Sequence, residues 1–152
     1  MAALQGDIDP AISRFFHGTT PEDEIDWIET LLTIDSEQGK IVKFILYPQQ
    51  RMMAMSSTGR DLTVKGRQTR ASSYILARNL RRMVTHEGLK CLVMTQDDQT
   101  TATFRARIKH HLADLAGRGY NCLSGKGLDN ENELVLNNES RYIFGSGEER
   151  TA

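Results

Sequence analysis

The sequence is poor in cysteine, in net charge and in long apolar runs. Its two cysteines, Cys91 and Cys122, lie 31 positions apart in 152 residues, which excludes a disulfide framework or a cysteine-rich zinc site. The formal net charge is -1 and the isoelectric point is near 6.4, so no global positive field favours nucleic acid or an anionic membrane. The mean hydropathy of -0.45 indicates no membrane-spanning helix. Any anion-binding site must therefore be local.

Targeting signals are also lacking. The first residues do not show the basic and then apolar segments of a secretory signal, so we expect a cytoplasmic protein. Hydrophobic residues make up 39% and charged residues 26%, a balance typical of one globular domain. Residues 1–19 show no helical or strand period and are predicted to be a flexible arm before a domain at 20–152.

Charge is distributed unevenly along this balanced chain. Residues 1–39 contain nine acidic side chains and one basic one, whereas residues 60–82 contain seven basic side chains and one acidic one. Three of the basic residues, Arg78, Arg81 and Arg82, have helical spacing and are predicted to form an ordinary exposed face. The remaining basic residues mark the segment where a phosphate would bind.

The first third of the chain predicts a helix, a turn, a strand and a helix. Thr20 and Pro21 are a typical helix start, and the apolar stripe that follows extends to about residue 32. A turn is expected at 36–40, a strand at 41–46 and a short helix at 49–55. The methionines of that helix are predicted to fill the core; they are Met52, Met53 and Met55.

The rest of the chain alternates strands and helices and ends in a hairpin. The expected elements are a strand at 61–64, a loop at 66–71, a helix from Ser72 as cap to about residue 86, a buried strand at 91–94, a helix at 98–115 and hairpin strands at 133–136 and 141–144. Such a β-α-β order predicts an α/β fold with a parallel sheet, flanking helices and a β-hairpin. The loop would then lie at the carboxyl end of a strand, where ligands bind in such sheets.

The loop has the context of a phosphate-binding loop but departs from the common motif. Such loops need backbone N–H groups, a cation and a hydroxyl at the start of the following helix. The segment Lys65-Gly66-Arg67-Gln68-Thr69-Arg70-Ala71-Ser72 offers all three. It does not match G-x-x-x-x-G-K-[ST], because Lys65, Arg70 and Ala71 replace the two glycines and the lysine.

These residues resemble the ATPase domain of the large subunit of tailed-phage terminases. In that family the loop reads K-x-R-Q-x-G-x-[ST], beginning with a displaced lysine. The segments that match in the same order are 39–44, 46–50, 63–73, the strand and polar turn at 92–96, the helix with Phe104, Ile108 and Leu112, and the hairpin at 134–144. The resemblance implies a P-loop NTPase fold and a motor that hydrolyses ATP to move DNA into a capsid, in the cytoplasm of a bacterial host cell.

The resemblance also implies roles for individual residues. Lys65 would be the catalytic loop cation, Ser72 the magnesium ligand, and Gln50, or alternatively Gln49, the residue that reads adenine. The other loop residues implied to contact nucleotide are Gly66, Arg67, Gln68, Thr69, Arg70, Ala71 and Ser73. The implied cofactors are ATP and Mg²⁺. The implied partners are double-stranded DNA, the terminase small subunit, the portal protein and further copies of the chain, with no membrane.

The sequence departs from the family pattern in two ways. Arg70 stands where the family has glycine, so either the loop is widened or Arg70 itself neutralises phosphate. The acidic strand end that orients magnesium and water, and the nuclease domain, are expected to lie beyond residue 152, so the domain looks truncated. This chain alone is therefore expected to bind nucleotide weakly and to hydrolyse almost none.

Other candidate sites and functions carry less weight. Asp97 and Asp98 follow a strand end, where they could bind magnesium, but Asp98 is predicted to cap the next helix. His110 and His111 are adjacent in a helix and therefore point about 100° apart, too far to share a metal easily. Two alternative functions stay open: a helicase or translocase ATPase, and a non-enzymatic module whose helix at 72–86 binds DNA phosphates.

Overall fold

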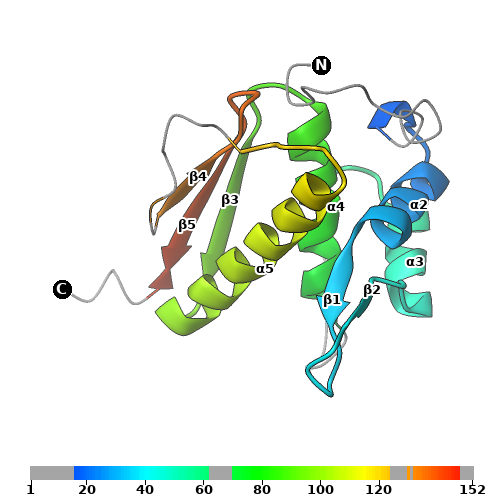
Figure 1. Cartoon of the computed structure of the whole chain (residues 1–152), viewed down its shortest axis with the longest axis horizontal. Coiled ribbons are helices and arrows are strands. Elements are labelled where there is room, and N and C mark those ends of the chain that lie inside the picture. The colour runs from blue at the N-terminus through cyan, green and yellow to red at the C-terminus, as the bar shows by residue number, and fades with distance from the viewer. Residues whose placement is uncertain (1–15, 62–69, 124–129, 131, 148–152) are drawn as a thin grey trace. The chain divides into compact units, whose positions relative to one another are not determined.

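The computed structural model describes residues 16–61, 70–123, 130 and 132–147 as a mixed α/β protein (Figure 1). The helices and strands are, in chain order, α2 (Pro21–Leu31), β1 (Thr33–Asp35), β2 (Ile41–Lys43), α3 (Pro48–Ser56), α4 (Ala71–Thr85), β3 (Lys90–Thr95), α5 (Asp98–Gly117), β4 (Glu133–Val135) and β5 (Arg141–Ser146). They belong to two compact units that divide between Arg81 and Arg82, inside α4. We refer to residues 16–81 as the N-terminal unit and to residues 82–147 as the C-terminal unit.

Helix α2 begins where its capping residues predict. The side chain of Thr20 accepts a hydrogen bond from the backbone of Asp23 at 3.1 Å, and the Asp23 carboxylate accepts one from the Thr20 backbone at 3.0 Å. This reciprocal pair satisfies two N–H groups that a helix start leaves without partners. The ring of Phe16 is buried and meets Trp27 edge to face at 6.1 Å. The described end of the predicted arm is therefore packed on the helix.

The expected strand at 41–46 is shorter than predicted and has a partner that the sequence did not reveal. β1 and β2 form an antiparallel hairpin around the predicted turn, with Ile34 opposite Val42. Its turn is fixed by a 2.7 Å hydrogen bond from the Ser36 backbone to the Lys40 carbonyl. After β2 the chain leaves the hairpin, and Phe44 and Leu46 enter the core.

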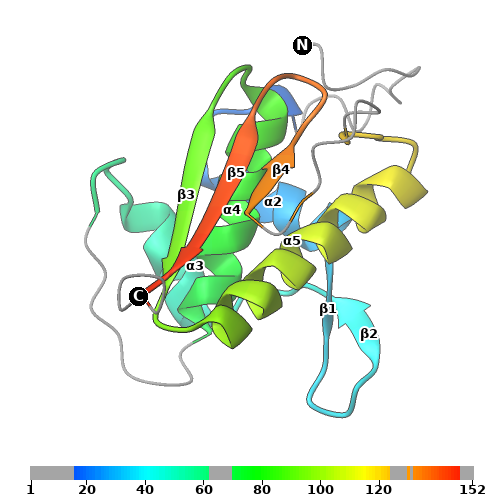
Figure 2. The same cartoon turned by 90° about the vertical axis from the view of Figure 1, so that its left-hand side faces the viewer.

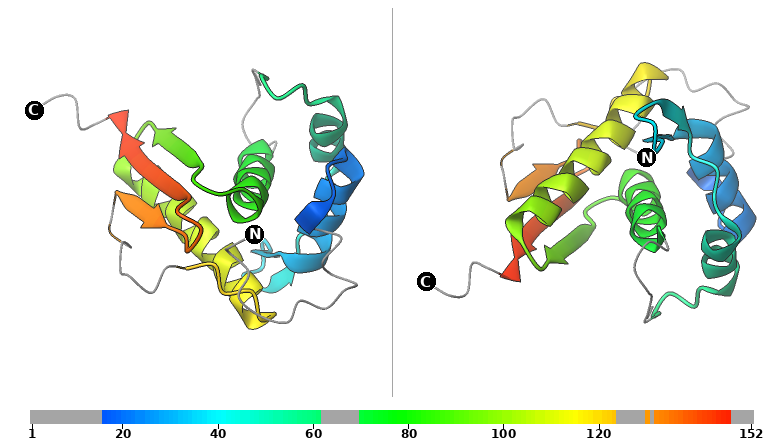
Figure 3. Two further views of the ribbon diagram at one scale, coloured as in Figure 1. Left: turned by 90° about the horizontal axis from the view of Figure 1, so that it is seen from above. Right: turned by 90° about the horizontal axis from the view of Figure 1, so that it is seen from below.

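Helix α3 packs beside α2, as Figure 3 shows, but not through its methionines. Met52 and Met55 are 65% and 54% exposed, whereas Gln50 and Ala54 are buried. The prediction that the methionines fill the core is therefore wrong for Met52 and Met55, while Met53 is half-buried. The helix turns the side chains spaced four apart, Gln50 and Ala54, inward, and this places Met52 and Met55 at the surface.

Helix α4 begins one residue before the predicted cap. Ser72 lies inside the first turn of the helix, so the prediction that Ser72 caps α4 is wrong. The helix ends at Thr85, and Gly88 just beyond it has a left-handed backbone with a φ of 67°. The helix stop is as predicted.

The C-terminal unit contains a three-stranded sheet with strand order β3-β5-β4 (Figure 2). β3 and β5 are parallel, with Val93 opposite Phe144, and β4 is antiparallel to β5. α5 packs against β3 and β5. Because strand residues alternate between faces, Val93 is buried while Leu92 is 64% exposed, so the prediction of a fully buried strand is wrong.

The predicted hairpin is confirmed, and its turn also caps α4. Glu139 in the turn has a φ of 66°, and Leu136 donates a 2.7 Å hydrogen bond to the Ser140 carbonyl. The side-chain amide of Asn138 donates to the carbonyls of Met83 at 2.8 Å and His86 at 3.0 Å. These bonds satisfy carbonyls that the helix end leaves without partners.

The parallel pairing found is that of β3 with β5, within a mixed sheet. The predicted strand at 61–64 lies largely outside the described residues. In the part of the chain that the structure describes, no helix is long and apolar enough to cross a bilayer.

Candidate functional site

The predicted site residues fall into two groups. Residues 65–69 of the loop, including Lys65 and Arg67, lie outside the described residues. Gln50 and the four residues from Arg70 to Ser73 are described, and all of them belong to the N-terminal unit. The described part of the predicted site is therefore the end of the loop, the first turn of α4 and Gln50.

Arg70, the last residue before α4, has a left-handed backbone. Its φ is 52°, a region that residues with a Cβ rarely adopt. Its carbonyl accepts hydrogen bonds from the Gln50 side chain at 2.8 Å and from the Ser73 backbone at 3.2 Å. These contacts hold the backbone in a conformation that costs an L-residue about 1 kcal/mol or more. The chain therefore makes its sharp turn into α4 at the position where the resembling family has glycine.

Gln50 joins this turn to the start of α3. Its side chain is 1% exposed; Oε1 accepts from the Tyr47 backbone at 2.9 Å, and Nε2 donates to Arg70. Because a buried amide is costly without partners, these two bonds explain why a polar residue occupies this position. Gln49, the alternative, is exposed. The adenine-reading role stays a prediction, and the structure assigns Gln50 a bracing role at the end of the loop.

The side chain of Arg70 is directed toward two other residues. Its guanidinium lies over the ring of Tyr47, 5.0 Å from the centroid, and one of its nitrogens donates to the Tyr47 hydroxyl. A second nitrogen forms an ion pair with the carboxylate of Glu37, in the β1–β2 turn. The Arg70 side chain remains 39% exposed. A cation is thus presented at the surface where the loop meets the helix.

The first turn of α4 supplies hydroxyls and backbone N–H groups. Ala71 is buried, while Ser72 and Ser73 are half-buried. A helix start favours anions because its N–H groups and dipole point toward them. No group of three or more His, Cys, Asp or Glu side chains that could hold a metal occurs among residues 16–61, 70–123, 130 and 132–147.

Asp61 is the last described residue before 62–69, and its side chain is held by neighbouring residues. Its carboxylate accepts hydrogen bonds from the Ser57 hydroxyl at 2.6 Å and from the Thr58 hydroxyl at 2.7 Å and backbone at 3.0 Å. These bonds, that from Ser57 first, hold the pKa of Asp61 well below its usual range because they favour the charged form. The described residues on either side of 62–69 are therefore both held by side-chain hydrogen bonds.

Arg78 on α4 connects this turn to α2. Its guanidinium lies 3.5 Å from the Glu24 carboxylate and 3.9 Å from that of Asp61, and it also donates to the Ser57 hydroxyl. The Tyr74 hydroxyl donates to Glu24 at 2.6 Å. The sequence did not point to Glu24 or Asp61 as partners, because their spacing from Arg78 gives no local pattern.

The predicted exposed arginine face is wrong for two of its three residues. Arg78 is partly buried in the cluster just described. Arg81 is 8% exposed and donates to the Gly18 carbonyl at 2.5 Å. Arg82 is exposed, as predicted. Their helical spacing correctly places these residues on one side of α4. Because the helix is largely buried, however, the long side chains of Arg78 and Arg81 contact carboxylates and a carbonyl rather than solvent.

In the C-terminal unit, the carboxylates after β3 have structural roles. Asp97, not Asp98 as predicted, caps α5 by accepting from the Thr100 backbone at 2.7 Å. This hydrogen bond from Thr100, with that from the Thr100 side chain, lowers the pKa of Asp97. Asp98 accepts from the hydroxyl of Ser146 at the end of β5. Asp98 thus joins the helix start to the sheet, while Asp97 caps the helix.

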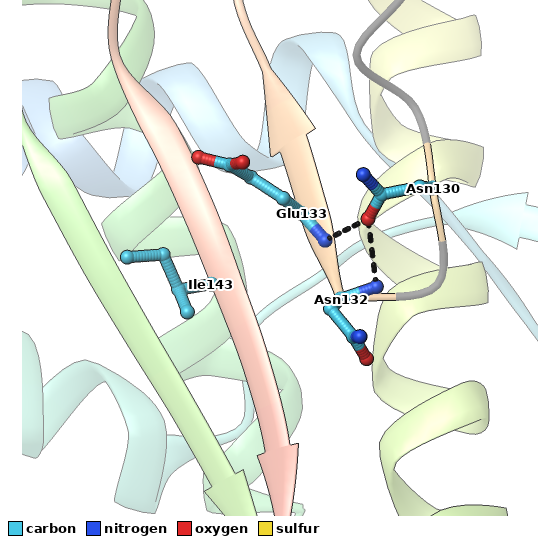
Figure 4. Close-up of a pocket in the computed structure, with 4 residues that line it drawn as sticks. All are labelled: Asn130, Asn132, Glu133 and Ile143. Atoms are coloured by element: carbon cyan, nitrogen blue, oxygen red, sulfur yellow. Dashed lines mark hydrogen bonds between the residues drawn. The ribbon is translucent and has the colours of Figure 1, made fainter.

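Among residues 82–123, 130 and 132–147, a histidine pair and an open cavity are the remaining candidate features. His110 and His111 lie 3.8 Å and 3.9 Å from the carboxylate of Asp114 on the same helix. An open cavity of about 510 Å³ is lined by Asn130, Asn132, Glu133 and Ile143 (Figure 4). Asn130 Oδ1 accepts there from the backbones of Asn132 at 3.0 Å and Glu133 at 2.8 Å. These bonds form a local turn, and no predicted site residue lines the cavity.

Compared with known proteins, the chain matches no protein-family model and, at a significant level, no curated protein sequence. The resemblance found in the sequence therefore depends on the motif residues themselves.

Proposed function

We propose that the chain contributes the nucleotide-binding part of a viral DNA-packaging ATPase of the terminase large-subunit type. The observation that carries this proposal is the left-handed backbone of Arg70 at the junction of the loop and α4. In the resembling family a glycine occupies this position, and glycine adopts that backbone without strain. Arg70 has the left-handed backbone that glycine adopts easily, and this supports a loop that follows the same path as in the resembling family.

Two further features support the same function. Gln50, from the segment that resembles the adenine-binding motif, hydrogen-bonds to the last carbonyl of the loop. The order of elements after the loop, helix, strand, helix and hairpin, is also that of the resembling domain. In the proposed P-loop fold, the segment at 61–64 is the strand that leads into the loop.

The proposed roles of the residues follow from the chemistry of phosphate binding. Lys65 would neutralise charge on the β- and γ-phosphates, while backbone N–H groups at the start of α4 face the same anion. Ser72 in the first turn would offer its hydroxyl to Mg²⁺, which supplies charge neutralisation on the phosphates when bound. The proposed partners are double-stranded DNA, a small subunit, a portal and further copies of the chain.

The alternative of a DNA-binding module loses part of its support. That alternative requires the arginines of α4 to face DNA phosphates. Arg78 and Arg81 instead contact Glu24, Asp61 and the Gly18 carbonyl. Sequestered cations contribute little to phosphate binding, which depends on releasing counterions from exposed charges. The helicase or translocase alternative would use the same nucleotide site. It differs from the proposed function in the nucleic-acid substrate on which the motor acts.

The test is a titration of the full chain with a fluorescent ATP analogue and Mg²⁺. We expect weak saturable binding that Lys65→Ala weakens by about tenfold, as the loss of one charge-assisted contact predicts. Arg82→Ala, which removes an exposed arginine of α4, is the matched control and should bind as the parent does. Binding that is absent, or equal in the Lys65 variant, would contradict the proposed function.

A further inference from the structure

Arg70 is held by a carboxylate at the position where the proposed nucleotide would place phosphate. One nitrogen of its guanidinium pairs with Glu37, another donates to the Tyr47 hydroxyl, and the plane lies over the Tyr47 ring. A guanidinium binds carboxylate and phosphate oxygens through the same pair of N–H groups. The two kinds of anion therefore compete for the same donors.

The ion pair of Glu37 with Arg70 costs little free energy to break. The side chain of Glu37 is 84% exposed, and it projects from a turn whose backbone is fixed by bonds between Ser36 and Lys40. An exposed ion pair contributes little free energy, and its long side chain regains freedom when it is released. Tyr47, by contrast, contacts the guanidinium through both its ring and its hydroxyl. Displacement of Glu37 would thus leave the cation in place.

We propose that Glu37 is an internal competitor that occupies Arg70 in the absence of nucleotide and is displaced by the phosphates of the bound ligand. The proposal rests on the proposed function and adds a regulatory contact to it. It also assigns Arg70 as a phosphate ligand. The ligand chemistry is that of an oligophosphate, since a chain of several phosphates carries enough charge to replace one carboxylate.

The proposal predicts the direction of a single change. Glu37→Gln keeps the size of the side chain and removes its charge, so ATP with Mg²⁺ should bind about twofold to fivefold more tightly at low salt. The gain should shrink at high salt, because screening already weakens an exposed pair. Inorganic tripolyphosphate, tested as a competitor, should show the same gain, since the contact is to phosphate rather than to the base.

Two variants separate this contact from general electrostatics. Asp35→Asn removes an exposed carboxylate at the end of β1, so it makes the same change in net charge near the same turn. It should leave affinity near that of the parent. In an Arg70→Gly background, Glu37→Gln should no longer change affinity, because the cation for which Glu37 competes is gone.

Each outcome decides between the alternatives. Equal gains in Glu37→Gln and Asp35→Asn, or a gain that persists in Arg70→Gly, would overturn the proposal in favour of a general field. Weaker binding in Glu37→Gln would overturn it because Glu37 would then position Arg70. If the parent binds and Lys65→Ala weakens binding while Glu37→Gln has no effect, this inference fails and the proposed function stands. If no variant binds nucleotide, both fail.

Discussion

The side chain of Gln50 donates a 2.8 Å hydrogen bond to the backbone carbonyl of Arg70, twenty residues further along the chain. This bond joins α3 to the turn that begins α4. It gives a buried amide its partner and fixes the carbonyl of a residue in a left-handed conformation. The bracing of the proposed phosphate loop thus depends on a residue from outside it.

Removal of Gln50 should affect both stability and binding. Gln50→Ala leaves the Tyr47 N–H and the Arg70 carbonyl without this partner, and we expect a loss of about 2 kcal/mol in the free energy of unfolding. Nucleotide affinity should also fall, because the end of the loop loses its anchor. Gln49→Ala, at the exposed neighbouring position, should change stability by less than about 0.5 kcal/mol. Urea unfolding of the two variants checks this, and equal stability would contradict the bracing role.

Local signals in the sequence predicted the elements well. Thr20, Pro21 and Asp23 define the start of α2, and Gly88 follows the end of α4, because caps and stops depend on residues within one turn. The apolar face predicted for α5 was confirmed for Ile108, Leu112 and Leu115, which are buried, while Phe104 is half-buried. Local chemistry therefore sufficed for elements whose signals lie within them.

Features that depend on distant partners could not be predicted. β1 has three residues, too few for a period, and exists because it pairs with β2. The destinations of Arg78 and Arg81 depend on how α4 packs, which spacing along one helix does not define. The cap of α5 was placed one residue late because Asp97 and Asp98 are equally good capping residues. In the candidate site, Glu37 was missed because it lies outside the matching segments. Tyr47 lies within 46–50 but was missed because its partner, Arg70, is 23 positions away in the sequence.

Arg78 provides a test of the buried cluster in the N-terminal unit. Arg78→Ala leaves the Glu24 carboxylate, 11% exposed, without its cation, and we expect a loss of about 3 kcal/mol in unfolding free energy. Arg82→Ala, one turn further along the same helix and exposed, should cost less than about 0.5 kcal/mol. In a Glu24→Gln background, Arg78→Ala should cost less than in the parent. A cost for Arg78→Ala no greater than that for Arg82→Ala would refute the cluster.

The lowered pKa of Asp61 predicts that the free energy of unfolding depends on pH. The pKa of Asp61 in the folded state is lowered by hydrogen bonds from Ser57 and Thr58, so the folded protein favours the charged form. The resulting stabilisation is present above the unfolded pKa of about 3.9 and is lost as pH falls through the folded value. Asp61→Asn should therefore be less stable than the parent at pH 7, with a difference that narrows below about pH 4. Unfolding curves measured against pH check this, with Asp35→Asn as the control; a difference independent of pH would count against it.

The backbone of Arg70 can be tested apart from its side chain. Arg70→Gly and Arg70→Ala both remove the contacts with Glu37 and Tyr47, so they differ in the cost of a left-handed backbone at this position. We expect the glycine variant to be more stable than the alanine variant by about 1 kcal/mol in urea unfolding. Glu139, whose φ is 66°, is the positive control, and its glycine variant should likewise exceed its alanine variant.

Nucleotide binding by the same two variants completes the argument. Both should bind ATP with Mg²⁺ more weakly than the parent, because both lack the guanidinium that we assign to phosphate. Arg70→Gly would then be the more stable variant of the pair and yet fail to recover the affinity of the parent, which separates loop strain from ligand contact. If Arg70→Gly instead bound more tightly than the parent, the arginine would be an obstacle in a loop shaped for glycine. If glycine and alanine were equally stable at position 70 while they differed at position 139, the left-handed turn that carries the proposed function would be refuted.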